Sequence, residues 1–410
     1  MTLLETPLAA ELSPLIVDGP SSGTESSALR LRKAVADGAG FGLIDASTRM
    51  LTMAALARHA DLDRGPSRLT LIAPPRDAPL DDRRSDEELF SFLATPDLAA
   101  RIDFDTPLET WCYQLMHSVL ADVRLGVDVA VVHKDAPTPR APKPWSPVDV
   151  IIPHRGREQH LRLCVDSVLR QDAATRIVVG LDQKARCTRL LKDLQAQPSA
   201  SVYQLDPSPA GPYVVRHHLG HAAKCAYMLG QDSDDVSVGA RLAMLLAASA
   251  ETGAGIVGSH ELCVQEVRRQ VLAVRYPLDA SAAIDRTGAG HQVLFPATLV
   301  RRDVFEAVGG FSTDKIFSLD VNFWLAASLL TEVRNVDEFL YIRRRRAGSL
   351  TMRRDIGNQS RIRRRIRDQR TSEFAAVREG RLALADSVLA LRHRPGPVAF
   401  RRLKPADDLD

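Results

Sequence analysis

Three carboxylates fall within four positions in the stretch Gln231-Asp232-Ser233-Asp234-Asp235. Carboxylates at this spacing repel one another by a few kcal/mol at an effective dielectric of about 20. A fold tolerates such a loop when a positive group, usually a divalent cation, lies between the carboxylates. Aspartate oxygens suit hard cations such as Mg²⁺ and Mn²⁺, which in turn bind phosphate oxygens. The alternative is an acidic helix cap, because Asp and Ser are favoured before a helix and in its first turn.

The elements around this acidic stretch favour a ligand site. An apolar segment at residues 222–229 precedes it and a helical pattern at residues 238–250 follows it. It therefore falls at a predicted strand-to-helix junction, where ligands bind in open α/β sheets. Upstream, residues 148–152 and 176–179 are predicted strands, and predicted helices begin at Glu158 and Arg189. Alternating strands and helices predict a nucleotide-binding half-sheet.

The part of the chain before this half-sheet is predicted to be a smaller α/β domain at residues 28–134, of unknown role. Residues 1–27, rich in Pro, Gly and Ser, are predicted to be a flexible arm. Residues 135–147 are predicted to be an extended linker, because proline fixes φ and removes a backbone donor. Within the domain, strands are predicted at residues 41–44, 69–72 and 127–132, and helices at residues 49–60, 85–93 and 108–125.

Composition limits the class of protein. The 410 residues are 45% hydrophobic and 26% charged, which describes a soluble globular chain with room for two or three domains. A net charge of +3 gives no reason to expect nucleic acid as a partner. Five scattered cysteines without a CxxC pair indicate neither a zinc site nor a disulfide framework, and they suit a cytoplasmic protein. We expect no signal peptide and no transmembrane segment.

The C-terminal region, residues 352–410, is strongly basic. Arginines alternate with apolar residues, which predicts two amphipathic helices broken near Gly380. Such a surface can contact anionic lipid, so a peripheral membrane contact stays open, as does a homo-oligomer. The commoner arrangement is a solvated face packed on its own domain. No aromatic residues interleave the arginines, which argues against binding of single-stranded nucleic acid.

Several segments together resemble the family-two glycosyltransferases, whose GT-A fold is Rossmann-like. The resemblance spans about residues 147–351, it includes the acidic stretch, and its specificity comes from the order of its motifs. The other matching segments are residues 148–153, 161–171, 299–311, 318–325 and 340–351. The resemblance implies a GT-A domain at residues 148–351. It also implies a hexosyltransferase-type enzyme whose donor is a nucleotide-diphosphate sugar, in the first place a UDP-sugar.

Roles are carried over position by position. Asp234 and Asp235 would hold Mn²⁺ or Mg²⁺ on the diphosphate, and Asp320 matches the catalytic base of inverting members. The residues expected around the nucleotide-sugar are Pro153, His154, Arg155, Arg157, Asp182, Arg216, Asp232, Ser233 and Arg346.

The chemistry of sugar transfer agrees with these roles. A departing diphosphate needs its developing charge stabilised, and a bound cation does this as a Lewis acid. The attacking hydroxyl needs a carboxylate within hydrogen-bond reach to take its proton. Asp320 opens a predicted apolar helix at residues 321–330 and can therefore project into a cleft, although it can also serve as the helix cap. Attack from the face opposite the leaving group inverts the anomeric carbon.

Three features depart from the family's pattern. Gly180 and Leu181 replace paired aspartates, and Leu319 replaces a glutamate before the candidate base. Arg346 stands where many members have a histidine that can bind the metal. An arginine cannot bind a cation, but it can grip a diphosphate with two hydrogen bonds. We therefore expect residues 343–346 to form part of a flexible flap over the diphosphate, the alternative being a solvated basic strand edge.

Other functions stay open. The acceptor would be a small metabolite, a peptide or a glycan, as in natural-product or polysaccharide biosynthesis. One alternative is a catalytically inactive, glycosyltransferase-like binding or scaffold protein. Another is a nucleotidyltransferase, which usually needs a Gly-rich loop where this chain has only Gly156. His217, His218, His221 and Cys225 lie close in sequence, but no second ligand pair completes a zinc set.

Overall fold

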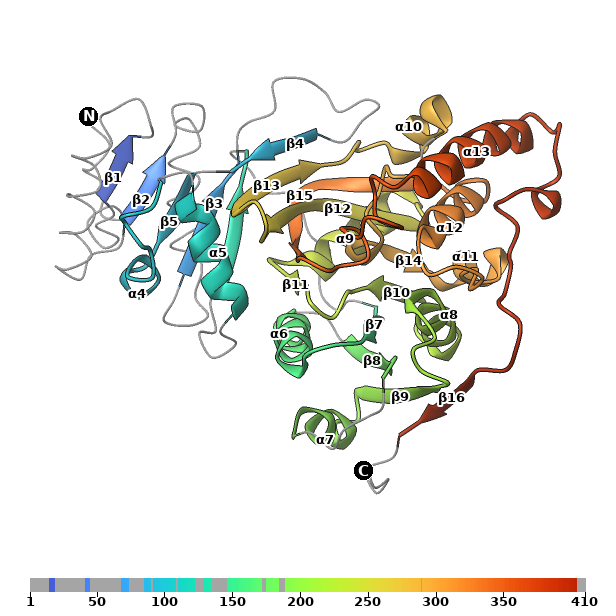
Figure 1. The fold of residues 1–410 in the computed structure, drawn as a ribbon, viewed down its shortest axis with the longest axis horizontal. Helices are drawn as coiled ribbons and strands as arrows, with labels where there is room; N and C mark the ends of the chain where they lie inside the picture. Colours follow the sequence, from blue (N-terminus) through green and yellow to red (C-terminus); the bar gives the residue numbers. More distant parts are fainter. Residues whose placement is uncertain are drawn as a thin grey trace.

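The computed structural model places two sheets side by side (Figure 1). The predicted helix at residues 49–60 and most of the predicted linker lie outside the residues that the structure describes. The described residues are 15–18, 41–44, 68–73, 85–89, 91–107, 110–121, 128–134, 146–171, 175–183, 189–288 and 290–403.

The N-terminal sheet has the strand order β1-β2-β5-β3-β6. The predicted strands at residues 41–44, 69–72 and 127–132 are confirmed, as is a helix within residues 108–125. Part of the predicted arm also joins the sheet, since β1 pairs in parallel with β2. The elements are β1 (Leu15–Asp18), β2 (Phe41–Ile44), β3 (Arg68–Ile72), β5 (Ser91–Ala94), α4 (Pro96–Ala99), α5 (Trp111–Ala121) and β6 (Asp128–Val132).

The helix predicted at residues 85–93 is wrong. This segment forms two strands, β4 (Ser85–Glu88) and β5. All four residues of β5 are buried between β2 and β3, and β4 pairs with a strand of the second sheet. Strand formation here depends on long-range pairing, which overrides the local helical pattern.

The second sheet has the order β11-β15-β12-β14-β10-β7-β8-β9-β16 along its main path, and β13 pairs with β12 beside it. Its strands are β7 (Val148–His154), β8 (Thr175–Leu181), β9 (Ala200–Asp206), β10 (Tyr227–Gly230), β11 (Val236–Ser237), β12 (Ile256–Gln265), β13 (Gln270–Arg275), β14 (Leu299–Arg301), β15 (Val333–Arg345) and β16 (Ala399–Arg402).

The half-sheet predicted from sequence is present. Strands β9, β8, β7 and β10 run in parallel and lie in that order across the sheet. Strand β7 therefore lies between β8 and β10. In sheets with such a reversal of strand order, ligands bind at the carboxyl ends of the strands, here those of β7 and β10. The helices of this half are α6 (Glu158–Leu169), α7 (Arg189–Ala196), α8 (Pro212–Ala222) and α9 (Arg241–Thr252).

One strand of the half-sheet is shorter than predicted. Residues 222–229 contain the end of α8 and only the first part of β10. Pro212 stands in the first turn of α8, where a proline is well tolerated because its missing N–H has no helical partner.

The C-terminal half of the fold covers the end of the second sheet. Figure 1 shows α13 (red) beside α12 and the tail running on to β16, which pairs with β9. No helix among the described residues is long and apolar enough to cross a membrane. The remaining elements are α10 (Ala280–Thr287), η4 (Phe295–Ala297), α11 (Arg302–Val308), α12 (Leu319–Ser328), α13 (Arg361–Arg378) and η5 (Leu384–Asp386).

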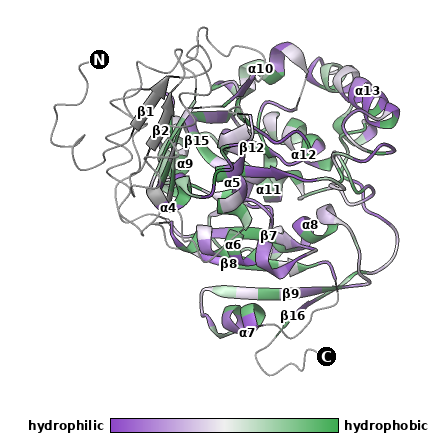
Figure 2. Ribbon diagram, turned by 60° about the vertical axis from the view of Figure 1, so that its left-hand side comes forward, coloured by the Kyte–Doolittle hydropathy of each residue, from purple (hydrophilic) through white to green (hydrophobic). Residues whose placement is uncertain are grey.

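Only the first of the two helices predicted in the basic tail is present. Helix α13 ends before Gly380, whose φ of +71° is accessible to glycine, and the chain then continues mainly through turns and bends, with the short helix η5. Phe374 and Arg370 of α13 are buried, so the helix packs on its own domain (Figure 2 shows mostly hydrophilic residues along it). Downstream, Leu389 joins the core around α12. Packing of single apolar residues, rather than a second amphipathic face, holds this part of the tail.

The two sheets share one hydrophobic core. Trp111 and Leu115 of α5 pack in the same buried cluster as Leu262, Val264 and Phe339 from the second sheet. Strand β4, which precedes the predicted linker, pairs with β13 of the second sheet. The domain boundary at residues 135–147 stays a prediction, but the segment before it contributes both a strand and core residues to the second half.

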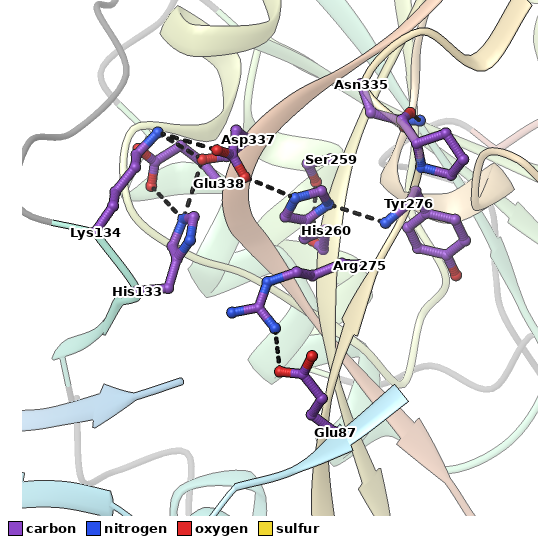
Figure 3. A network of polar contacts seen from close by, with 11 residues as sticks. Glu87, His133, Lys134, Ser259, His260, Arg275, Tyr276, Asn335, Asp337 and Glu338 are labelled. Atoms are coloured by element: carbon purple, nitrogen blue, oxygen red, sulfur yellow. Dashed lines mark hydrogen bonds and ion pairs between the residues drawn. The ribbon is translucent and has the colours of Figure 1, made fainter. Parts of the chain in front are cut away.

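A polar network crosses the same junction (Figure 3). His133 Nε2 and Lys134 Nζ donate to the backbone carbonyl of Asp337, at 3.1 and 2.8 Å. His260 Nε2 donates to the Asp337 carboxylate (3.0 Å), and its Nδ1 accepts from the amide of Tyr276 (3.2 Å). These two bonds fix the tautomer of His260 with its proton on Nε2.

Burial makes His133 an uncharged member of this network. Its pKa is lowered to about 3, chiefly by burial, with His260, Arg275 and Lys134 adding to the effect against Asp337. In the unfolded chain the imidazole has its ordinary pKa of about 6.5. Between these two values the unfolded state binds more protons than the folded state, so the free energy of unfolding falls as the pH is lowered.

We expect His133→Gln to reduce the acid sensitivity of the fold. Glutamine keeps a donor for the Asp337 carbonyl but does not titrate. Over the interval from pH 7 to pH 5 the variant should lose about 2 kcal/mol less free energy of unfolding than the parent. Chemical denaturation at both pH values measures this difference. His117→Gln, at an exposed position of α5, is the control, and equal losses in parent and His133→Gln would contradict the prediction.

Candidate functional site

The acidic loop, residues 231–235, joins β10 to β11 at the reversal of strand order. Gln231 is fully buried beneath it and donates to the backbone carbonyls of Asp232 (3.3 Å) and Asp235 (3.1 Å). The side-chain oxygen of Gln231 accepts from Arg241 Nη1 (2.7 Å) and from the hydroxyl of Ser237 (2.9 Å). The loop is therefore held by its own first residue.

Asp235 lies in the interior, with its side chain only 2% exposed. One carboxylate oxygen accepts from the Tyr341 hydroxyl (2.7 Å) and the other from the backbone amide of Arg344 (2.7 Å). Burial, followed by Asp234 and Asp232, raises the pKa of Asp235 well above its usual range. The expected metal ligand Asp235 thus serves in the structure as an anchor between the loop and β15.

Asp232 and Ser233, two of the residues expected around the nucleotide-sugar, also have partners in the structure. Asp232 pairs with Arg216 Nη2 at 2.5 Å, and Arg216 lies over the rings of Tyr213 and Phe295. Ser233 shares a hydrogen bond of 3.0 Å with His154 Nδ1. Burial, then His160, lowers the pKa of His154 to about 4, so its imidazole is neutral at pH 7. Four predicted residues from three separate segments therefore meet at this loop.

Asp234 also has a positive partner. Arg346, just after the end of β15, donates to Asp234 Oδ2 from Nη2 (2.6 Å) and from Nε (3.0 Å). Both side chains are partly exposed, at 37% for Arg346 and 25% for Asp234. The guanidinium occupies the place where the sequence predicted a divalent cation.

The structure does not show the flap that the sequence predicted at residues 343–346. Residues 343–345 are part of β15, which lies inside the sheet between β11 and β12. Arg343 pairs with the buried Glu261, and the side chain of Arg344 donates to the carbonyl of Leu120. The alternative of a solvated strand edge is also wrong, because neither arginine is exposed. Only Arg346 leaves the strand and reaches the acidic loop.

Several arginines act on His160, in the first turn of α6. Burial, then Arg344, Arg346 and Arg157, lowers the pKa of His160 to about 4. Three arginines from two segments thus act on one histidine at the start of α6. Arg157 is exposed and available to a ligand, and Arg155 beside it is exposed as well.

The remaining predicted nucleotide residues lie at the ends of β7 and β8. Asp182 is buried, and its two oxygens accept from the amides of Ala210 (2.6 Å) and Gly211 (2.9 Å). It therefore holds the loop that leads into α8. Half-buried Pro153 belongs to β7, and Gly156 exchanges hydrogen bonds with Gln183. These contacts order the loops at the ends of these strands, while contact with a nucleotide stays a prediction.

Asp320 lies in the first turn of α12, and Ser318 rather than Asp320 occupies the N-cap position of this helix, without a capping hydrogen bond from its side chain. The Tyr213 hydroxyl donates to Asp320 Oδ1 at 2.8 Å. Tyr213 in turn lies under the guanidinium of Arg216, which pairs with Asp232. Asp320 is also one of the carboxylates that raise the pKa of Asp232, after burial and Asp234. The candidate base and the acidic loop thus belong to one continuous polar chain.

Helix α13 supports the position of Asp320. Arg370 donates to the carbonyl of Ser318 (3.1 Å), and Arg363 lies over the ring of Phe317. Ser318 has a φ of +59°, a conformation that costs a non-glycine residue energy unless its surroundings hold it. The basic tail therefore stabilises the turn that directs Asp320.

The residues around Asp234 do not fit a divalent cation. Mg²⁺ or Mn²⁺ at a phosphate site is usually held by one or two protein carboxylates, with water and substrate phosphates supplying the other ligands. Here Asp235 uses both of its oxygens and Arg346 already holds Asp234. Within the described ranges, no three His, Cys, Asp or Glu side chains come together as a metal site. A divalent ion about 4 Å from a guanidinium would be repelled by about 8 kcal/mol at a dielectric of about 20. Metal binding by Asp234 and Asp235 stays a prediction against which this geometry argues.

Some residues that build the site carry no signal in the sequence. Tyr213 and Tyr341 bind the candidate base and the acidic loop through their hydroxyls. Arg241 is fully buried and donates to the carbonyls of Gly230 (3.0 Å) and Pro296 (2.7 Å). A tyrosine or arginine within an apolar pattern is usual, so only the three-dimensional contacts identify these residues.

Two departures from the family's pattern have packing reasons. A Cβ atom at Gly180 would lie 2.5 Å from Val215 Cγ1, so α8 could not pack against β8 with a larger residue there. Leu319 is 2% exposed and belongs to the core around Trp324. Neither substitution points to a loss of catalytic groups.

Comparison with known proteins assigns a family to the segment that contains the acidic loop. Residues 149–309 match the model of glycosyl transferase family 2. This segment is a family 2 glycosyltransferase domain. The predicted GT-A fold of the glycosyltransferase domain is confirmed. No curated protein matches the chain.

Solved structures of S. aureus TarS are also similar. A structure of TarS 1–349 with UDP-GlcNAc is 19% identical over 49% of this chain and 59% of that one, with a TM-score of 0.41. A complex of TarS 1–349 with UDP is 16% identical over 58% and 73%, with a TM-score of 0.41. This chain therefore spans about three fifths of the first structure and about three quarters of the second.

We expect Tyr341→Phe to destabilise the glycosyltransferase domain. The substitution removes the donor to buried Asp235 and the acceptor for the Asp232 amide (3.2 Å). An unpaired buried polar group costs about 1–3 kcal/mol, so the free energy of unfolding should fall by about that amount. Tyr203→Phe is the control, since Tyr203 stacks on Phe400 through its ring. Equal stabilities for the two variants in urea would show that the hydroxyl of Tyr341 does not hold the loop.

Proposed function

We propose that the chain transfers a sugar from a nucleotide-diphosphate donor, in the first place a UDP-sugar, to a hydroxyl of an acceptor with inversion. One observation carries the proposal. The polar chain from Asp232 through Arg216 and Tyr213 to Asp320 joins the donor-side loop to a candidate base. Both ends lie in a family 2 glycosyltransferase domain or directly after it, and the loop lies at the reversal of strand order.

Each group in this chain has a chemical role in the proposal. Asp320 accepts the proton of the acceptor hydroxyl, and the hydrogen bond from Tyr213 keeps the carboxylate in position. The acceptor oxygen forms a bond to the anomeric carbon while the bond from that carbon to the diphosphate breaks. The nucleoside diphosphate leaves with the electron pair. Asp232, already ordered by Arg216, is directed to the ribose.

The acceptor class follows from the base. A hydroxyl is a weak nucleophile that needs a carboxylate to take its proton during attack. We therefore propose an acceptor with a free hydroxyl, whether on a small metabolite, a peptide or a glycan. The divalent cation expected from the sequence has no step in this proposal, because Asp234 and Asp235 are engaged with protein groups.

We expect Asp320→Asn to abolish turnover while nucleotide binding persists. Asparagine keeps the size of the side chain and can still bond to Tyr213, but it cannot accept the acceptor's proton. Loss of a general base typically costs about 10²–10⁴-fold in rate. The assay is release of UDP or GDP from a panel of nucleotide-sugars incubated with hydroxyl-bearing acceptors. Calorimetric titration with UDP reports binding in parallel.

Asp193→Asn, at a half-exposed carboxylate of α7, is the matched control and should keep parental turnover. Unchanged turnover in Asp320→Asn would remove Asp320 as the base. Binding of UDP without turnover of any nucleotide-sugar by the parent would favour the binding or scaffold protein instead.

A further inference from the structure

We infer that Arg346 takes the place of a divalent cation at the donor diphosphate, so that this glycosyltransferase binds its nucleotide without a metal. The inference rests on the proposed function, because it concerns the same donor site. It reverses the expectation of Mn²⁺ or Mg²⁺ drawn from the acidic stretch alone.

The first argument is that every carboxylate of the acidic loop already has its partner. Asp232 pairs with Arg216 at 2.5 Å. Asp234 receives two hydrogen bonds from Arg346, at 2.6 and 3.0 Å. Asp235 is buried and accepts from a tyrosine hydroxyl and a backbone amide. The repulsion within the loop is thus relieved by protein groups, and no ion is needed for the loop to fold.

The second argument is the geometry of the guanidinium. Arg346 binds one oxygen of Asp234 through Nε and Nη2, which leaves hydrogens on Nη1 and Nη2 that do not point at this carboxylate. Those donors suit phosphate oxygens, which a guanidinium binds in a bidentate manner. Asp234 is then a positioning residue that fixes the fork, rather than a ligand of a metal.

The third argument is the charge around the site. Arg344 and Arg157 act on the same His160 as Arg346 does, so the positive groups gather on one side of the acidic loop. Arg157 is exposed, and Arg346 is 37% exposed, so both can reach a ligand. A diphosphate at this place would meet fixed positive charge supplied by the chain itself.

The experiment is calorimetric titration of UDP and of GDP into the full chain, once with EDTA and once with Mn²⁺. We expect at least one nucleotide to bind in EDTA with an affinity within a few-fold of that in Mn²⁺. Arg346→Gln should weaken binding in EDTA by about tenfold or more, as loss of a charge-assisted contact does. Arg346→Lys keeps the charge but loses the forked geometry, so its affinity in EDTA should lie between those of the parent and of Arg346→Gln.

Arg345→Gln is the matched control. Arg345 is the last residue of β15, directly before Arg346, and its side chain bonds to Met352 instead of the acidic loop. This variant should bind as the parent does. Circular dichroism of all variants checks that they are folded, and the partial exposure of Arg346 favours this.

The outcomes separate the two proposals. Binding in EDTA that depends on Arg346 supports the inference. Binding that requires Mn²⁺, or binding in EDTA that Arg346→Gln leaves unchanged, overturns the inference while the proposed donor class stands. Absence of binding by both nucleotides under both conditions overturns the proposed donor class and this inference together.

Discussion

The pairing of β15 with β11, the strand that directly follows the acidic loop, is the interaction on which the rest of the site depends. Ser237 of β11 is in register with Tyr341, so the tyrosine hydroxyl arrives between the amide of Asp232 and the carboxylate of Asp235. In the same strand the amide of Arg344 donates to Asp235, and Arg346, directly after the strand, donates to Asp234. Without this pairing Asp234 and Asp235 would repel each other without the donors that β15 and Arg346 supply. A single strand thus makes a concentrated negative charge compatible with a buried, ordered loop.

The N-terminal part of the chain contacts β15, the strand that holds the acidic loop. Its core residues, such as Trp111, pack with Phe339 of β15, and Arg344 of the same strand donates to the carbonyl of Leu120 on α5. The His133 and Asp337 contacts attach it to β15 a second time. The strand that organises the acidic loop is therefore braced from the N-terminal side. This gives the N-terminal region a supporting role for the site, whatever else it binds.

The C-terminal tail supports the other end of the polar chain. Arg370 of helix α13 donates to the carbonyl of Ser318 in the turn before α12. The tail then continues to β16, which pairs with β9. Asp320 is consequently held from two sides, by Tyr213 beneath it and by the turn at Ser318. A carboxylate with fixed orientation is what proton transfer from an acceptor requires, because misplacement of the reacting atoms is costly. Some of the many arginines of the tail therefore hold the fold together, and others are exposed to solvent.

Local sequence determined the elements that need no distant partner. The buried apolar run of β7, the helices at Glu158 and Arg189, and the three aspartates in one loop could all be predicted, because periodicity and residue type decide them within a few positions. Segments whose state depends on pairing, such as residues 85–93, could not.

Only the tertiary structure decided what neutralises the carboxylates. Arg346 meets Asp234 across 112 residues, and Tyr213 meets Asp320 across 107. An acidic cluster in a sequence shows that positive charge must be near, but a cation in solution and an arginine from a distant strand satisfy that need equally. The choice between them depends on how the chain folds back on itself, which the local pattern does not contain.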